Sequence, residues 1–348
     1  MRADRRANNS RGNIPDAHIA NPKDFCAGID VGGTKISSAL FTKTGGILGK
    51  TKVPIARSGG EQAADQVAET IASLDKTAAR VGGRMLAVGI SIPGIVYSAS
   101  GKVWAPNIPG WDRFPLRDWL ERCGQKGGHV PEVRVPMILE SDRSAYVTGE
   151  AWQGAAAGAA DAVFLAVGSG IGAGILAGGR VIHGHEDIAG AVGWFGLNPE
   201  FKPVYAEMGC FEAEASGNSV GRKARELLSS GRSSVMIELA KGRIEDVTAE
   251  TVAEAARMKD PLALQVVDDV VHYLAMGIAN IVSILNPEVI VLGGGLFQAS
   301  DIFPDLVRRD FRKWAQPLAA RDVRIELSAL GEDAGLYGCG KLAWDSMA

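Results

Sequence analysis

The chain has 348 residues, and its 37 Lys and Arg against 40 Asp and Glu leave a formal net charge of -3. This near balance argues against a general nucleic-acid or membrane-surface binder, which would show a basic excess. The length predicts two domains or one large two-lobed unit, with a core large enough to need no disulfide or metal staple. Glycine accounts for 44 of the 348 residues, about 13% against a usual level of about 7%. This excess indicates tight turns and close backbone approaches to a ligand.

The cysteines, the apolar runs and the N-terminus together predict a cytoplasmic protein. The four cysteines are far apart and form no CxxC pair, which favours buried, reduced thiols. No apolar run approaches the ~18 residues of a membrane span. Residues 1–24 are polar and lack the apolar core of a secretory signal, so we expect a disordered tail that ends before Phe25.

The first half of the chain reads as short strands and amphipathic helices. Three short runs separated by Gly-rich turns predict a β-meander over residues 25–30, 36–41 and 47–53. The elements expected next are a helix over 61–79, a buried strand over 85–92 that ends at Pro93-Gly94, a helix near 115–123 and a strand over 135–140. Ser141 or Asp142 then caps another helix.

The second half repeats the opening pattern. Residues 161–182 read as two strands around a Gly-rich turn, an echo of the first meander that indicates two related lobes. Residues 183–211 show no clear period and indicate an active-site loop region. The remaining expected elements are helices near 212–229, 248–257, 261–285, 305–315 and 333–347 and strands over 287–295 and 323–327. This alternation predicts an α/β fold with mixed sheets flanked by helices, in which the apolar helix 261–285 is central and buried.

Three glycine turns, each at the end of a strand, could bind phosphate. They are Asp30-Val31-Gly32-Gly33-Thr34-Lys35, Gly168-Ser169-Gly170-Ile171-Gly172 and Gly293-Gly294-Gly295. Successive backbone N–H groups without a Cβ in the way form an anion-binding concavity, to which Thr34 and Ser169 add hydroxyls and Lys35 a positive charge. Asp30 could hold Mg²⁺ through water or phosphate oxygens. Each turn alone is more often only a turn, and the first two join strand to strand, which excludes P-loop and Rossmann mechanics.

Asp142 has two readings. It lies where a strand ends and a helix begins, a usual place for a catalytic group in an α/β sheet. There a carboxylate can accept the proton of a hydroxyl that attacks a phosphoryl group. Cap preferences alone favour a plain helix N-cap.

Six blocks in order resemble the ROK family of bacterial sugar kinases and related repressors. The blocks are IDVGGTK, GISIPGIVYSASGKVWAPNIPGW, ESDRSAY, VGSGIGAGI, GCFEAEASG and NPEVIVLGGGLF, and the resemblance runs from about Phe25 to the C-terminal helix. It implies a two-lobed actin/hexokinase-like (ribonuclease H-like) fold, with an N-terminal lobe of residues 25–141 plus 332–348 and a C-terminal lobe of 142–331. It also implies ATP as donor, Mg²⁺, and transfer to a sugar hydroxyl, commonly the 6-hydroxyl of a hexose.

The resemblance assigns roles to single residues. Asp30 to Lys35 and Gly168 to Gly170 look like the two phosphate-binding hairpins, and Gly293 to Gly295 look like the turn beside the adenosine. Asp142 matches the catalytic base. Asn107 and Glu212 match sugar ligands.

The departures from the family pattern fall in the sugar site. The Asn that often precedes the catalytic Asp is Ser141 here, and the AGExGH block reads AGAVGW, with Ala191 and Trp194. A site built to bond a hydroxyl discriminates strongly, so these changes predict an altered substrate, with an amino or otherwise modified hexose as one reading. The loop residues His183, His185, Glu186 and Asp187, and the aromatic residues Trp104 and Trp111, could contribute, although a solvated loop and packing are the commoner roles.

The zinc segment of the family is also altered. CxCGxxGC reads PVYAEMGC and keeps only Cys210. One thiol cannot make a four-ligand structural site, so we expect no structural zinc.

Three function classes remain. The retained residues favour a carbohydrate kinase with ATP and Mg²⁺ as its cofactors and a small sugar as its partner, with no nucleic acid and no membrane. A regulator is disfavoured because only about 24 residues precede the first strand, too few for a helix-turn-helix. A pseudokinase that binds nucleotide without turnover stays open. A homodimer would be an ordinary assembly.

Overall fold

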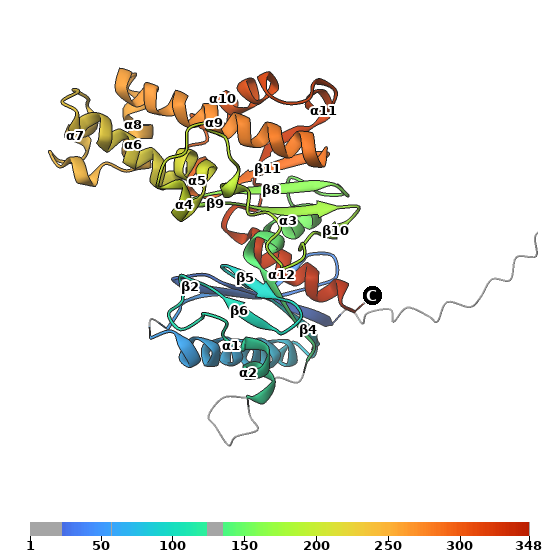
Figure 1. Ribbon diagram of the computed structural model, residues 1–348. Coiled ribbons are helices and arrows are strands. Elements are labelled where there is room, and N and C mark those ends of the chain that lie inside the picture. Colours follow the sequence, from blue (N-terminus) through green and yellow to red (C-terminus); the bar gives the residue numbers. More distant parts are fainter. Residues whose placement is uncertain (1–22, 57, 124–134, 348) are drawn as a thin grey trace, which may run out of the picture.

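The computed structural model describes residues 23–56, 58–123 and 135–347 (Figure 1). The expected tail over 1–24 lies outside the described residues except for Lys23 and Asp24, and the first strand already begins at Asp24. Two five-stranded sheets lie one above the other in Figure 1, with two helices between them.

The first sheet has the order β3-β2-β1-β4-β7, in which β1, β4 and β7 run parallel and β2 and β3 complete an antiparallel meander. Its strands are β1 (Asp24–Val31), β2 (Lys35–Phe41), β3 (Ile47–Pro54), β4 (Arg84–Ile92) and β7 (Met137–Ser141). The register places Asp30 beside Ser91 and Ser91 beside Glu140, so one edge of the sheet gathers three polar side chains.

The second sheet repeats this plan with the order β10-β9-β8-β11-β12. Its strands are β8 (Ala162–Val167), β9 (Ile171–Ala177), β10 (Arg180–Val181), β11 (Val289–Gly293) and β12 (Arg324–Leu327). Here β8, β11 and β12 are parallel, and β9 and β10 are antiparallel. The predicted α/β fold with mixed sheets is therefore confirmed, and a small separate hairpin of β5 (Ile95–Tyr97) and β6 (Lys102–Trp104) adds to it.

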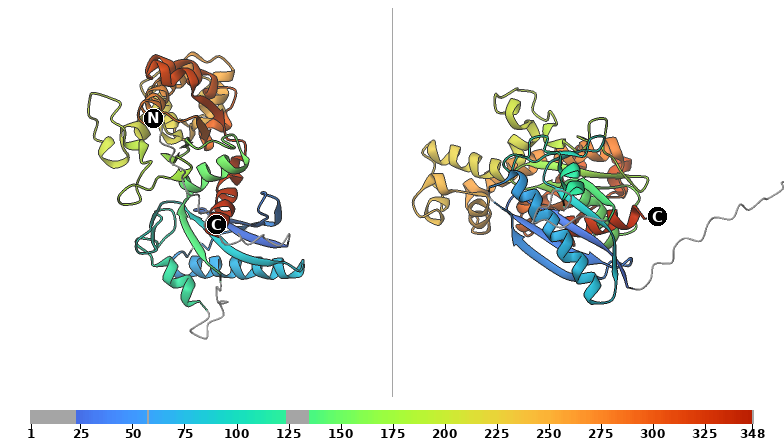
Figure 2. Two further views of the ribbon diagram at one scale, coloured as in Figure 1. Left: turned by 90° about the vertical axis from the view of Figure 1, so that its right-hand side faces the viewer. Right: turned by 90° about the horizontal axis from the view of Figure 1, so that it is seen from below.

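Helices form layers around the two sheets (Figures 1 and 2). The outer face of the first sheet packs on α1 (Gly60–Arg80), and its inner face on α12 (Ala334–Asp345). Helix α3 (Asp142–Gln153) packs on α12 on one side and on the second sheet on the other. The two helices approach closely because Gly338 lies against the carbonyl of Ala145, where a Cβ would come within 1.8 Å of the oxygen.

The largest apolar cluster lies on the face of the second sheet that is turned away from the first sheet, around α9 (Pro261–Leu285) (Figure 1). Contrary to the expectation that no apolar run approaches a membrane span, this helix is long and apolar enough to cross a membrane by length and composition. Most of its apolar residues are buried against the sheet and its neighbours. The expectation of a buried central helix is confirmed. The other helices are α2 (Leu116–Arg122), α4 (Tyr205–Met208), α5 (Cys210–Ala215), α6 (Gly217–Ser229), α7 (Met236–Leu239), α8 (Ala249–Arg257), α10 (Phe303–Asp310) and α11 (Pro317–Asp322).

Two expected helices differ from the prediction. The one over 212–229 is broken into α5 and α6 because Ser216 adopts an extended backbone and its side chain accepts a hydrogen bond from the backbone of Ser219. The one over 305–315 ends at Asp310 and continues as a short 3-10 turn, Phe311–Lys313. The region 183–211 holds no long element, as expected, but it contains α4 and the 3-10 turn η1 (Val192–Trp194).

Candidate active site

Asp30 lies at the end of β1 and is enclosed on several sides. Its Oδ1 accepts a hydrogen bond from Ser91 Oγ at 2.5 Å. The start of α12 covers it so closely that a Cβ on Gly335 would lie within 3.0 Å of both carboxylate oxygens. Burial raises the pKa of Asp30, while the Ser91 hydroxyl and the charge of Lys35 oppose that rise. A half-buried carboxylate at this position suits a ligand that brings positive charge.

The first glycine turn is tight and its lysine is occupied. The backbone N–H of Gly32 donates to the carbonyl of Lys35 at 2.8 Å and closes the turn. The ammonium of Lys35 pairs with Glu332 at 3.0 Å, and Lys52 pairs with the same carboxylate at 2.7 Å. Lys35 therefore lies at the turn with a carboxylate as its partner, and Thr34 is exposed.

The structure separates the two readings of Asp142. Ser141 is the N-cap of α3, since its Oγ accepts from the backbone of Ser144 at 3.3 Å and donates to Ser144 Oγ at 2.9 Å. Asp142 is the first helical residue, and its carboxylate accepts from the N–H of Arg143 at 2.8 Å and from Tyr146 Oη at 3.4 Å. The cap role thus belongs to Ser141.

The surroundings of Asp142 raise the pKa of its carboxyl group toward neutral pH. Burial raises the pKa of Asp142 to about 6. The positive charge of Arg143 lowers it, the negative charge of Asp30 raises it further, and the hydrogen bonds from Arg143 and Tyr146 lower it. A carboxyl group with such a pKa is ionised at pH 7 and can accept a proton.

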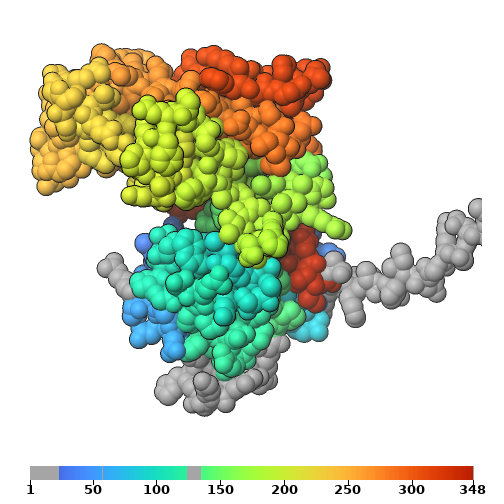
Figure 3. Space-filling view, viewed as in Figure 1, coloured from blue at the N-terminus to red at the C-terminus, as the bar shows by residue number. Residues whose placement is uncertain are grey.

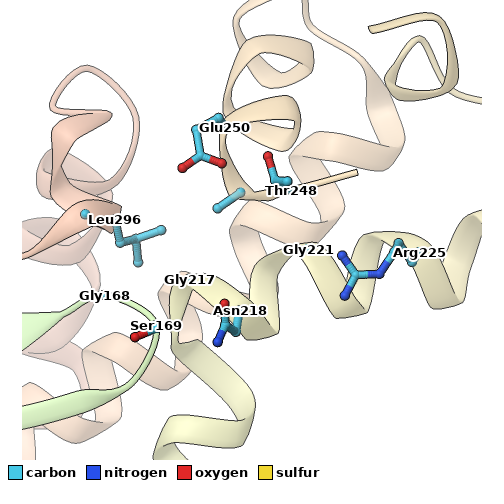
Figure 4. A pocket seen from close by; sticks show the side chains of 11 residues that line it. Gly168, Ser169, Gly217, Asn218, Gly221, Arg225, Thr248, Glu250 and Leu296 are labelled. Carbon is cyan, nitrogen blue, oxygen red and sulfur yellow. The ribbon is translucent and has the colours of Figure 1, made fainter. Parts of the chain in front are cut away.

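The second and third glycine turns lie together and line a cavity of about 330 Å³ (Figure 4). Gly294 has φ 93° and lies so close to Val167 that a Cβ would meet its carbonyl oxygen at 2.5 Å, so the third turn packs directly on the end of β8. The carbonyl of Gly168 accepts from the N–H of Gly217 at 2.7 Å, which joins the second turn to α6. The cavity is lined by Gly168, Ser169, Gly217, Asn218, Gly221, Arg225, Thr248, Ala249, Glu250, Gly295 and Leu296.

The predicted sugar ligands lie on both sides of the site. Asn107 packs against the first turn, where a Cβ on Gly33 would touch it at 2.9 Å. The Oε2 of Glu212 accepts from the N–H of Ile171 in the second turn at 2.7 Å, and burial raises its pKa. Trp194 is 58% exposed on η1, whereas the hydroxyl of Ser141 is buried in the helix cap.

Sequence reasoning missed two contacts at the edge of the first sheet. Ser91 donates to Asp30, and its only signal in the sequence is its place two residues before the Pro93-Gly94 break. Glu140 lies in the ESDRSAY motif with no role of its own indicated by the sequence, yet its Oε2 pairs with His183 Nε2 at 2.6 Å. Strand register brings Ser91 to Asp30, and the path of the loop after β10 brings His183 to Glu140. A linear pattern encodes neither.

The other candidate residues have other partners. Trp111 is fully buried and its indole donates to the carbonyl of Gly60 at 2.9 Å, so it is a packing residue. Asp187 accepts from Ser98, and the side chains of His185 and Glu186 are 96% and 66% exposed.

A buried ionic cluster occupies the region of the altered zinc segment. Glu214 on α5 has a side chain only 3% exposed and pairs with Lys202 at 2.6 Å and Lys223 at 2.7 Å. Tyr205 donates its hydroxyl to the same carboxylate. These partners lower the pKa of Glu214 to about 2 in spite of its burial. Among the described residues no group of three or more His, Cys, Asp and Glu side chains could hold a metal ion.

The chain is similar to known proteins over most of its length. The model of the ROK family matches residues 26–346. A glucokinase of Halalkalibacterium halodurans is 34% identical over 325 residues, which cover 90% of this chain and 93% of that protein. A ROK family glucokinase of Streptomyces griseus, solved in complex with glucose and AMPPNP, is 27% identical with a TM-score of 0.70 and covers 92% of this chain and 99% of that one.

The relatives also include regulators. A putative xylose repressor of Caldicellulosiruptor sp. is 31% identical over 258 residues, which are 73% of this chain and 61% of that protein. With a family match across nearly its whole length and a full-length relative above 30% identity, the chain belongs to the ROK family.

Proposed function

We propose that this protein is an ATP-dependent carbohydrate kinase that transfers the γ-phosphoryl group of ATP to a sugar hydroxyl, with Asp142 as general base. The observation that carries the proposal is the carboxylate of Asp142, free of the cap role and with its pKa raised to about 6. Such a group is ionised at neutral pH and basic enough to take the proton of an attacking hydroxyl. The glucokinase names of full-length relatives support the same reaction class.

On the donor side, the 330 Å³ cavity is our proposed adenosine site. Figure 4 shows the Gly168–Ser169 turn on one side and Thr248 and Glu250 across from it. We expect the backbone of Gly168 to Gly170 to bind phosphate oxygens and Gly293 to Gly295 to lie beside the nucleoside. Gly32, Gly33, Thr34 and Lys35 would bind the phosphates from the first sheet, with Lys35 exchanging Glu332 for a phosphate oxygen.

The residues present fit a magnesium ion that is held mainly by the nucleotide. Mg²⁺ prefers hard oxygen ligands and usually takes one or two carboxylates with phosphate oxygens and water. Asp30 offers such a carboxylate at the edge of the sheet, through water or phosphate. When bound there, the ion would neutralise charge on the transferring phosphoryl group.

The chain's own residues then position the acceptor and move one proton. The N–H of Arg143 and the hydroxyl of Tyr146 orient the carboxylate of Asp142, which takes the hydroxyl proton as the oxygen attacks. Backbone N–H groups of the glycine turns stabilise the charge on the phosphoryl oxygens.

On the acceptor side we propose Asn107, Glu212, Trp194 and Ser141 as the surroundings of a hexose, phosphorylated at its 6-hydroxyl. Ala191 and Trp194 offer no carboxylate or imidazole to a ring hydroxyl, while the exposed indole of Trp194 offers an apolar face. A modified or amino hexose is therefore the substrate class that this site suits. We propose a cytoplasmic enzyme, with a homodimer as its ordinary assembly.

A non-catalytic sugar- or nucleotide-binding protein is the second candidate. It is favoured by the altered sugar site and by the repressor among the relatives. The comparison of the wild-type protein with Asp142→Asn in a sugar-dependent ATP consumption assay separates the two. A kinase loses ~10²–10⁴-fold in turnover with ATP binding intact, whereas a binding protein shows no turnover in either form.

A further inference from the structure

The loop over residues 182–191, between β10 and η1, reaches from the second sheet to the first sheet at one point and to the β5–β6 hairpin at another. Nε2 of His183 lies 2.6 Å from Oε2 of Glu140, at the end of β7. Asp187 Oδ2 accepts from the backbone N–H of Ser98 at 2.9 Å and from its hydroxyl at 3.1 Å, just after β5. In Figure 3 the yellow-green part of the chain bridges the upper and lower bodies, beside the hollow between them.

The first contact is tied to the backbone that leads to Asp142. The side chain of Glu140 is only 10% exposed, and its other oxygen, Oε1, accepts from the N–H of Ser141 at 2.8 Å. A largely desolvated carboxylate makes a strong pair with an imidazolium, and the hydrogen bond to Glu140 raises the pKa of His183. His183 is thus linked through one carboxylate to the residue that precedes Asp142.

The loop is internally fixed between its two contacts. The N–H of Ala189 donates to the carbonyl of His183 at 2.9 Å, and the carbonyl of Gly190 accepts from Ala173 on β9 at 2.8 Å. Asp187 has φ 58°, a left-handed conformation that Asp tolerates better than most residues because of its short polar side chain. A loop shaped in this way presents His183 to the first sheet and Asp187 to the β5–β6 hairpin at once.

We propose that His183 and Asp187 are positioning residues that hold loop 182–191 against the first sheet and the β5–β6 hairpin and so close the acceptor side of the site over Asp142. This proposal rests on the proposed kinase function. The loop leads directly into Ala191 and Trp194, the altered part of the sugar site, so its position sets where these residues face the acceptor. A closed acceptor side excludes water, which competes with the sugar for the phosphoryl group.

In this arrangement the polar side chains of the loop need not serve as the missing sugar ligands. His183 and Asp187 have partners on the first sheet and its hairpin, and His185 and Glu186 are exposed. We therefore assign the loop a role through its position, which the side chains of His183 and Asp187 fix.

The test uses the full chain with His183→Ala and Asp187→Gly, the latter because glycine keeps the positive φ without strain. His185→Ala, in the same loop and 96% exposed, is the matched control. Each positioning variant should raise KM for the sugar about tenfold, the worth of one charge-assisted hydrogen bond. It should also increase ATP hydrolysis relative to transfer and leave KM for ATP unchanged. Ser98→Ala, which removes one donor to Asp187 from outside the loop, should move in the same direction.

A second readout separates this proposal from the kinase proposal. Amide hydrogen exchange of residues 182–191 should become faster in His183→Ala and Asp187→Gly and stay unchanged in His185→Ala. If the wild-type protein phosphorylates no sugar, the kinase proposal fails, and unchanged exchange in the variants would show separately that the loop is not held. Unchanged exchange, or an unchanged sugar KM and hydrolysis ratio in an active enzyme, overturns the positioning role.

Discussion

One hydrogen bond, from the backbone N–H of Ile171 to the carboxylate of Glu212, links the proposed sugar site to the proposed phosphate site. The carboxylate on α5 accepts the N–H of Ile171 at 2.7 Å, at the point where the second glycine turn enters β9. The backbones of Gly170 and Gly193 pack directly against this carboxylate. A Cβ on either glycine would lie about 3 Å from Glu212 Oε2, so a larger residue would not fit there. A proposed sugar ligand is thus fixed to a proposed phosphate-binding turn.

We expect Glu212→Gln and Glu212→Ala to separate these two roles. The glutamine can still accept from Ile171 but carries no charge, so KM for the sugar should rise about tenfold while KM for ATP stays constant. The alanine also frees the turn, so KM for ATP should rise as well. Steady-state kinetics with both substrates varied measure this, with the exposed Glu207→Gln in the same region as control. Equal effects of the two variants on ATP would contradict the link.

The raised pKa of Asp142 predicts a pH profile. Because the base must be ionised, kcat/KM should fall as the pH drops through about 6, and it should be level above that value. Ionisation of Asp142 supports activity but lowers the stability of the folded protein. A carboxyl group with a raised pKa binds its proton more tightly in the folded state, so its ionisation costs stability, and this loss builds up from the ordinary carboxyl pKa of about 4 to about pH 6 and is complete above it. Asp142→Asn should therefore raise Tm by a few degrees at pH 7.5 and leave it unchanged near pH 4. A profile without a limb near pH 6 would remove Asp142 as the base.

Much of the fold could be predicted because its signals are local. Apolar runs marked the strands, and the period of residues 261–285 marked the central helix. The glycine turns could be placed for the same reason, since each directly follows a strand. The break between α5 and α6 was missed because it rests on the side chain of Ser216, which bonds to the chain three residues on.

The side-chain contacts within the site could not be predicted from the sequence. Ser91 lies 61 residues from Asp30, and Glu140 lies 43 residues from His183. Only strand register and the path of a loop bring these pairs together. Whether Asp142 or Ser141 capped α3 was likewise open, because both residues suit the position and only the geometry of the helix start decides.

Ser91→Ala tests the environment of Asp30. The hydrogen bond from Ser91 lowers the pKa of Asp30, so its removal should raise that pKa further. A carboxyl group that is less ionised should bind Mg²⁺ more weakly. We expect kcat/KM for MgATP to fall about tenfold, with partial recovery at higher pH or higher Mg²⁺. Ser91→Thr keeps the hydroxyl and should restore activity, while Ser73→Ala on the exposed side of α1 is the control. Full activity of Ser91→Ala at pH 6.5 would argue against this role of Asp30.

The cluster around Glu214 should stabilise the protein without zinc. Glu214→Gln leaves Lys202 and Lys223 beside a neutral amide, so thermal unfolding should shift down by several degrees, in line with up to about 3 kcal/mol for a broken buried pair. Because the pKa of Glu214 is lowered to about 2, its contribution is complete above about pH 4.5 and is lost as the pH falls toward 2. EDTA should leave the wild-type Tm unchanged. Metal analysis that finds about one tightly bound zinc per chain would refute the zinc-free reading.

The altered sugar site predicts a change of selectivity on reversion. The double variant Ala191→Glu and Trp194→His returns the two ligand types of the family pattern, so plain glucose should become a better substrate relative to amino or deoxy analogues. The ratio of kcat/KM values for glucose and an amino hexose measures this, since one hydroxyl-bonding group changes discrimination by large factors. A wild-type enzyme that already uses glucose far better than any analogue would contradict the proposed substrate class.

The central claim is that this chain phosphorylates a sugar with ATP. The most direct measurement is mass spectrometric detection of a sugar monophosphate after incubation of the purified protein with MgATP and a panel of hexoses, amino sugars, N-acylated sugars and polyols. The account predicts one or a few phosphorylated products, formed together with ADP and lost in Asp142→Asn. Measurable ATP binding without any sugar phosphate across the panel would contradict the kinase assignment and favour a non-catalytic member of the ROK family.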